Sequence, residues 1–192
     1  MEMKRAFERE RERVLRNLDL QRQALEALEA PILDAARAIR RCLESGGKVL
    51  FFGNGGSAAD AQHWAAELSG RYQRERPGLA GLALTTDTSL LTAVANDYGF
   101  EEVFARQVEA LARKGDVAVA ISTSGSSPNV LKGLDRARQL GCATVAVLGR
   151  DGGIAAAKAD VAIVYGAVDT PRIQEFHAVV GHLLCALAEA EG

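Results

Sequence analysis

Five short apolar runs place the strongest constraint on how this chain can fold. They occupy residues 48–52, 79–84, 116–121, 144–148 and 161–164. The runs are continuous rather than alternating, which is typical of strands that are covered on both faces in a parallel sheet. Segments with helical periodicity lie between them. The sequence therefore predicts an α/β fold, a three-layer αβα sandwich around a five-stranded parallel sheet.

The expected helices lie between and around these strands, at residues 57–69, 89–95, 100–114, 129–140, 153–157 and 173–191. Residues 1–45 contain no glycine and carry an apolar stripe of coiled-coil-like spacing, from Val14 and Leu18 to Ile32. Pro31 is expected to divide this stretch into two helices. We predict an N-terminal helical segment at 1–45 that packs partly on another subunit, followed by one α/β domain at 46–192.

Composition and charge exclude several classes of function. The formal net charge of −2 leaves no basic excess for binding a nucleic acid. No apolar run approaches the roughly 20 residues that a membrane helix needs, and the charged N-terminal segment does not resemble a signal peptide. Cys42, Cys142 and Cys185 are widely spaced, so we expect them to be reduced core residues of a cytoplasmic protein.

Two loops rich in glycine and serine follow two of the expected strands. Gly53–Ser57 comes after the strand at 48–52, and Ser122–Ser127 comes after the strand at 116–121. Glycine lets a backbone approach a ligand closely, and the N-terminus of the following helix offers free N–H groups to an anion. Ser57 is also a favourable N-cap. Either loop alone could be a tight strand–helix turn, but two at one edge of a sheet predict a phosphate site.

All three histidines lie on helices that should border this edge. His63 and Glu67 are four residues apart, so they share a helix face and could hold a divalent metal; a solvated ion pair is the simpler alternative. Gln174, His177 and His182 lie on the last helix, where a lone histidine is more often a core residue. Gln174 and His182 are about 12 Å apart along a regular helix. One ion could bind both only if the helix starts later or two subunits contribute.

Four ordered motifs resemble the sugar isomerase (SIS) superfamily. They are Gly53–His63, Ala95–Phe100, Ile121–Gly125 and Arg172–His177. More specifically, the chain resembles the bacterial phosphoheptose isomerases along nearly its whole length. The resemblance implies a homotetramer with active sites at subunit interfaces and one Zn²⁺ per subunit. It also implies conversion of sedoheptulose 7-phosphate to D-glycero-D-manno-heptose 7-phosphate, the first step towards ADP- or GDP-activated heptose.

The resemblance also implies roles for individual residues. The metal ligands would be His63, Glu67, Gln174 and His182. The substrate contacts would be Asn54, Gly55, Gly56, Ser57, Glu67, Asn96, Asp97, Ser122, Thr123, Ser124, Ser127 and Gln174. Ketose–aldose isomerisation moves a proton between C1 and C2 through an enediol, so it needs a base and stabilised oxygens. We assign Glu67 as the base and His182 as the acid, although binding a metal would compete with the role of Glu67 as a base.

Two other functions occur in proteins that this chain resembles. A binding protein without activity, such as the replication initiator-associating factor, lacks the acid–base pair that is present here as Glu67 and His182. Isomerases or etherases of hexosamine or pentose phosphates share the serine loops but not the four metal ligands. Ser126 stands where relatives often have Asn, and it can still donate a hydrogen bond. These comparisons favour the isomerase.

Overall fold

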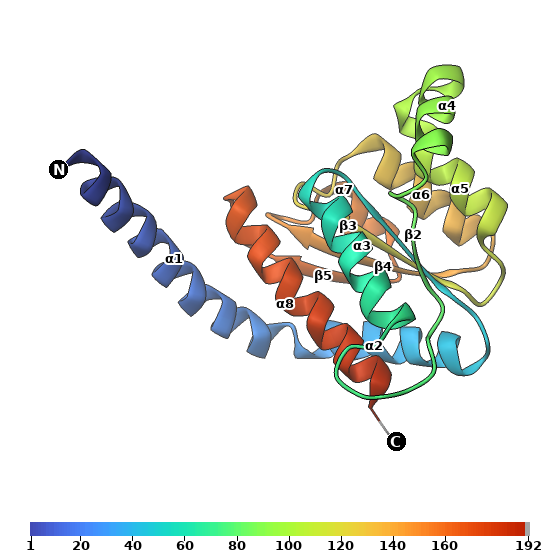
Figure 1. Cartoon of the computed structure of the whole chain (residues 1–192), viewed down its shortest axis with the longest axis horizontal. Helices are drawn as coiled ribbons and strands as arrows, with labels where there is room; N and C mark the ends of the chain where they lie inside the picture. The colour runs from blue at the N-terminus through green and yellow to red at the C-terminus, as the bar shows by residue number, and fades with distance from the viewer. Residues whose placement is uncertain (191–192) are drawn as a thin grey trace.

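The computed structural model describes residues 1–190 and confirms the three-layer α/β architecture (Figure 1). One sheet contains five strands in the order β2-β1-β3-β4-β5, and every neighbouring pair is parallel. The strands are β1 (Val49–Gly53), β2 (Gly81–Ala83), β3 (Val117–Ser122), β4 (Ala143–Gly149) and β5 (Val161–Tyr165). Because all five run the same way, their carboxyl ends meet at one edge, where ligands bind in such sheets.

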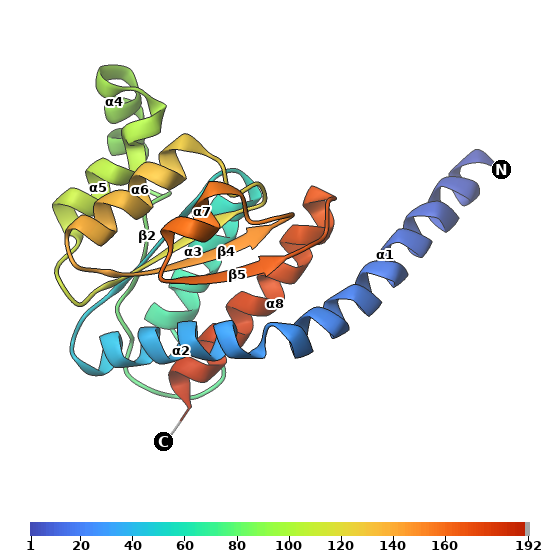
Figure 2. The same ribbon diagram turned by 180° about the vertical axis from the view of Figure 1, so that it is seen from behind.

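Alternate side chains of the strands enter two separate apolar cores, because successive side chains of a strand point to opposite faces. Phe51 belongs to the core formed with α2 (Glu29–Glu44), α3 (Gly56–Ser69) and α8 (Thr170–Glu189). Phe52 belongs to the core on the opposite face. The helices over that face are α4 (Thr88–Tyr98), α5 (Val103–Leu111), α6 (Pro128–Gln139) and α7 (Gly153–Lys158) (Figure 2). Burial on both faces explains why the strand sequences are apolar throughout.

The N-terminal segment forms two helices, as expected, but they meet at Leu28 rather than at Pro31. α1 (Glu2–Ala27) projects away from the sheet, whereas α2 packs against it (Figures 1 and 2). Pro31 lies in the first turn of α2, where a backbone N–H would have no partner within the helix, so proline is tolerated there. The prediction that Pro31 itself is the break was therefore wrong by about one turn.

Other boundaries differ from prediction where local hydrogen bonds intervene. The helix expected at 100–114 begins as a separate 3₁₀ turn, η1 (Phe100–Glu102), and its α-helical part ends at Leu111. The backbone at Ala112 is extended, and the N–H of Arg113 donates to the carboxylate of Asp116 instead of continuing the helix. The edge strand expected at 79–84 is only three residues long. Residue 191, the expected end of the last helix, lies outside the described residues.

Asp116 connects the starts of β1 and β3, the strands that lead into the two loops. Its carboxylate accepts hydrogen bonds from the backbone N–H of Lys48 at 3.0 Å and of Arg113 at 2.7 Å, and the Lys48 ammonium lies 2.6 Å away. Burial alone would raise the pKa of Asp116, but these bonds outweigh it and lower the pKa below its usual value. The two strands are thus held in register at the end remote from the loops.

All three cysteines are free and buried, which confirms the expectation that they are core residues. Burial raises the pKa of the Cys142 thiol to about 11 and that of Cys185 to about 12, so neither is a thiolate nucleophile near neutral pH. Among residues 1–190, no helix combines the length and apolar character that crossing a membrane requires.

Candidate active site

The two glycine/serine loops lie side by side at the carboxyl edge of the sheet, as predicted. β1 and β3 are neighbours, with Gly53 opposite Ile121. The side-chain amide of Asn54 in the first loop exchanges two hydrogen bonds of 2.8 Å with that of Asn129, at the start of α6. Asn129 was not predicted, although its position two residues after Ser127 was a usable signal. This amide pair fixes the spacing between the loops.

The first loop ends in the N-terminus of α3, and glycine is essential to its shape. Gly55 is the N-cap of the helix, with φ of +58°, a conformation that disfavours other residues. Ser57 was expected to be the cap, but it is buried within the first turn. A Cβ on Gly56 would lie 2.2 Å from Nε2 of Gln174, so the amide of Gln174 covers this turn. A cavity of about 130 Å³ opens beside Asn54 and Gly55.

The second loop is shaped by its own hydroxyl groups. The Ser122 hydroxyl accepts a hydrogen bond from the N–H of Gly125 at 3.0 Å, and the N–H of Ser126 lies 3.3 Å from the Ser124 hydroxyl. Gly125 has φ of +62°, and a Cβ there would lie 1.9 Å from the carbonyl of Gly152. Thr123, Ser124 and Ser127 stay partly exposed at the edge of the sheet. Their hydroxyl groups can donate to an anion.

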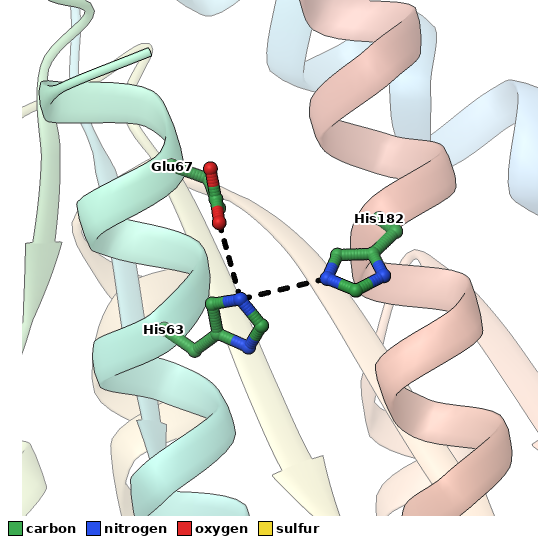
Figure 3. Close-up of side chains that lie close together, drawn as sticks. All are labelled: His63, Glu67 and His182. Atoms are coloured by element: carbon green, nitrogen blue, oxygen red, sulfur yellow. Dashed lines mark hydrogen bonds and ion pairs between the residues drawn. The ribbon is translucent and has the colours of Figure 1, made fainter. Parts of the chain in front are cut away.

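A second polar group lies further along α3. His63 and Glu67 face His182 on α8, and Figure 3 shows the three side chains converging between the two helices. His63 Nε2 lies 3.1 Å from Glu67 Oε1 and 3.5 Å from His182 Nε2. The ligand atoms of all three lie within 4.8 Å of one another. The structure thus unites a pair predicted from helical spacing with a histidine more than a hundred residues away in sequence.

The chemistry and spacing of these three residues suit a divalent metal. A tetrahedral zinc ion with ligands at 2.0–2.2 Å keeps neighbouring ligand atoms roughly 3.4 Å apart. The separations of His63 Nε2 from Glu67 Oε1 and from His182 Nε2, 3.1 and 3.5 Å, agree with that spacing. Two imidazoles and a carboxylate are also a frequent donor set for zinc. The group is partly open to solvent, which leaves room for a fourth ligand.

Gln174 is not part of this group within one chain. α8 is a continuous helix from Thr170 to Glu189, so Gln174 and His182 lie about 12 Å apart along it. Gln174 covers Gly56 instead, seven residues before His63 on α3. If all four residues hold one ion, a second copy of the chain must supply some of them.

Asn96 and Asp97 also lie apart from both loops within one chain. Both side chains are exposed on α4, where the Asn96 amide donates to Asp97 at 2.8 Å. Among residues 1–190, neither forms a hydrogen bond with the loops. Figure 1 shows α4 projecting from the body of the fold. Their predicted contact with a substrate would therefore require a neighbouring subunit.

Two side chains near His63, Glu67 and His182, the candidate metal ligands called the metal group below, were not predicted from the sequence. The ring of Tyr72 stacks on the imidazole of His182, with centroids 5.5 Å apart and planes 25° apart. Tyr72 lies in a charged, irregular segment after α3, which carries no periodic signal. Asp60, one turn before His63, has a buried carboxyl oxygen; burial raises its pKa to about 6, and His63 opposes that rise.

Two other residues considered from the sequence, His177 and Asp169, contribute to the structure of α8 and its surroundings. His177 is fully buried, and burial lowers the pKa of its imidazole to about 4 against the opposing effect of the Leu148 backbone. It is therefore neutral near pH 7 and remote from solvent. Asp169 is the N-cap residue of α8, and its carboxylate pairs with Arg13 of α1 at 2.7 Å.

Comparison with known proteins finds a matching domain family and similar proteins along most of the chain. Residues 16–149 match the model of the SIS domain family. A phosphoheptose isomerase of Helicobacter hepaticus is 56% identical over 169 residues, which cover 88% of this chain and 86% of that protein. A solved phosphoheptose isomerase from Neisseria gonorrhoeae is 44% identical, with a TM-score of 0.90 over 96% of this chain and 98% of that one. A phosphoheptose isomerase structure from Francisella tularensis is 34% identical, with a TM-score of 0.93 over 97% and 99%.

Proposed function

We propose that this chain, which belongs to the SIS domain family and within it to the phosphoheptose isomerases, interconverts sedoheptulose 7-phosphate and D-glycero-D-manno-heptose 7-phosphate. One observation carries the proposal. The group of His63, Glu67 and His182 lies about two helical turns along α3 from a pair of anion-binding loops. An open-chain sugar phosphate has its reacting carbons, C1 and C2, at the end opposite its phosphate. The proposed site is arranged in the same way, with the candidate metal ligands at one end and the two loops at the other.

The loops bind the phosphate without a fixed cationic side chain. Backbone N–H groups at the start of α3, with the positive end of its dipole, attract the anion. The hydroxyl groups of Ser122, Thr123, Ser124 and Ser127 complete the shell from the neighbouring strand. In this assignment, Asn54 orients the first loop through Asn129 and contacts the sugar chain.

The three-residue group carries out the proton transfers. Glu67 removes the proton from the carbon next to the carbonyl and returns it to the neighbouring carbon. His182 moves a proton between the two oxygens, so the enediol is never left with an unneutralised charge. The hydrogen bond between Glu67 and His63 keeps the carboxylate aimed into the space between α3 and α8.

His63, Glu67 and His182 would hold Zn²⁺, with Gln174 as the fourth ligand from a second subunit. When bound, the ion acts as a Lewis acid on the substrate oxygens. Gln174 and His182 are too far apart on one helix to bind the same ion. We therefore propose that two subunits contribute the ligands at their interface. We also propose a cytoplasmic location, which the free thiols of the three cysteines support.

The reaction is tested by offering the purified protein sedoheptulose 7-phosphate and detecting the aldose product in a coupled assay. Fructose 6-phosphate, a hexosamine phosphate and a pentose phosphate serve as control substrates. We expect turnover of the heptose phosphate at least tenfold above the others. Turnover of only a hexose or pentose phosphate would assign the chain a different SIS activity. Binding of sugar phosphates without any turnover would contradict an enzymatic role.

We further propose that the protein is a homotetramer in which α1 packs on other subunits. α1 buries only Asn17 and Gln21 in its own chain, while Phe7 and Leu18 are 64% and 53% exposed. A helix with this many exposed apolar residues is marginal alone and gains stability from packing. The interface would also bring Asn96 and Asp97 of α4 near the loops of a neighbour.

Removal of residues 1–27 is expected to reduce the mass of the assembly and abolish turnover, because interface contacts and shared site residues are lost together. Light scattering measures the mass. Leu18→Glu is the milder variant: the side chain is exposed in the single chain, so its fold should be kept, as circular dichroism can verify. A tetramer that survives both changes would show that α1 is not the assembly element.

A further inference from the structure

The carboxylate of Glu189, in the last turn of α8, is almost completely buried. Its side chain is 1% exposed and accepts hydrogen bonds from three consecutive backbone N–H groups, those of Tyr72, Gln73 and Arg74, at 2.7, 3.1 and 3.0 Å. Three N–H groups directed at one anion form a concave binding site of the kind that holds phosphates in other proteins. Here the anion is the chain's own side chain, and it orders the segment that follows α3.

Arg76 connects this carboxylate to the end of α3. Its guanidinium lies 3.0 Å from Glu189 Oε1 and donates to the carbonyls of Glu67 and Leu68, each at 2.9 Å. Those carbonyls belong to the last turn of α3, where helices lack internal partners for their C=O groups. The arginine side chain is 13% exposed. The ends of α3 and α8 are therefore joined through one buried ion pair.

These two helices carry the metal group, and the same segment contacts it directly. α3 supplies His63 and Glu67, α8 supplies His182, and the ring of Tyr72 stacks on the His182 imidazole. The His182 imidazole thus contacts two rings, that of Tyr72 by stacking and that of His63 edge-on, with centroids 5.0 Å apart for the histidine pair. The Tyr72 backbone that sets this stack is bonded to Glu189.

We propose that Glu189 is a positioning residue of the active site, which acts through Arg76 and Tyr72 to set the separation and orientation of His182 relative to His63 and Glu67. Its catalytic consequence rests on the proposed function, whereas its effect on metal binding does not. The phosphate loops are at the other end of α8, about 22 Å from Glu189 for the 15 residues from Gln174. The inference therefore predicts an effect on metal affinity and kcat with little effect on KM.

The test compares Glu189→Gln with Glu44→Gln, a matched change at an exposed arginine pair on α2. Glutamine keeps the shape of Glu189 but places an NH₂ group among N–H donors and leaves Arg76 without its counterion. Zinc affinity is measured by calorimetry on metal-free protein. We expect a 10- to 100-fold loss for Glu189→Gln, as for other residues that support metal ligands, and a similar fall in kcat. Glu44→Gln should change neither.

Tyr72 provides variants that leave the ion pair intact. Tyr72→Leu removes the stacked ring, and Tyr72→Phe keeps it; we expect weaker zinc binding and a lower kcat only for leucine. If Glu189→Gln does not fold, the comparison of Tyr72→Leu with Tyr72→Phe tests the proposal in its place. Folded variants with zinc affinity and kcat within twofold of the unchanged protein would overturn the proposal and leave Glu189 a structural residue. If the unchanged protein fails to turn over the heptose phosphate, the proposed function fails, and the zinc measurements still decide this inference.

Discussion

Glu67→Gln is expected to reduce turnover of the sugar phosphate by about 10²–10⁴-fold, the range typical of a lost general base. Glutamine has the same shape, but it cannot accept a proton from carbon, and its neutral amide is a weaker metal ligand. The fold should survive, because the ion pair between Glu67 and His63 is partly exposed and such pairs contribute roughly 0–1 kcal/mol. KM should change little, since the loops proposed to bind phosphate lie about three helical turns from Glu67.

Initial-rate kinetics on metal-loaded protein measures this prediction, with thermal denaturation as the check on folding. Glu44→Gln, at an exposed arginine pair on α2, is the control for loss of one negative charge. Metal content must be determined for each variant, because a drop in activity from metal loss alone would be restored by excess zinc. Near-normal turnover of a zinc-free or zinc-loaded variant would show that another group removes the proton.

The sheet could be predicted because each of its signals is local. The run that contains Phe51 and Phe52 shows that both faces of a strand are buried, and the order of strands and helices along the chain then leaves few topologies. The pair of His63 and Glu67 was equally accessible, since a spacing of four residues defines one helix face. Predicted helix boundaries were wrong where a single hydrogen bond to a side chain ended a helix, as where the Arg113 N–H donates to Asp116.

The assembly of the site could not be predicted from spacing alone. That His182 meets His63 depends on the packing of α8 against α3, which no local pattern encodes; only the resemblance to a known family suggested it. Tyr72 was missed for a related reason. Its position depends on a hydrogen bond to Glu189, more than a hundred residues later. In the sequence alone, the segment around Tyr72 therefore looks like an ordinary polar loop.

The close approach of α3 and α8 is possible because Gly181 has no side chain. A Cβ at this position would lie 1.9 Å from Cε2 and 2.0 Å from Nε1 of Trp64, which is fully buried between the helices. Gly181 directly precedes His182, and Trp64 directly follows His63. One methyl group would therefore force the two helices apart beside the metal group.

Gly181→Ala is accordingly expected to lower the free energy of unfolding by about 1–3 kcal/mol, as overpacking does, even though alanine is the better helix former. Zinc affinity should fall with it, because the separation between His63 and His182 increases. Thermal denaturation and calorimetric zinc titration measure the two effects.

The double variant Gly181→Ala/Trp64→Phe distinguishes this steric cause from others. Phenylalanine removes the indole atoms that the new methyl group would meet, and Trp64 Nε1 has no hydrogen-bond partner within residues 1–190, so no hydrogen bond is lost with it. We expect the pair to recover part of the stability and zinc affinity, with a coupling of about 0.5–3 kcal/mol. Additive losses in the double variant would mean that the contact between Gly181 and Trp64 does not set the spacing of α3 and α8, and an unchanged zinc affinity in Gly181→Ala would mean that the site of His63, Glu67 and His182 tolerates the change.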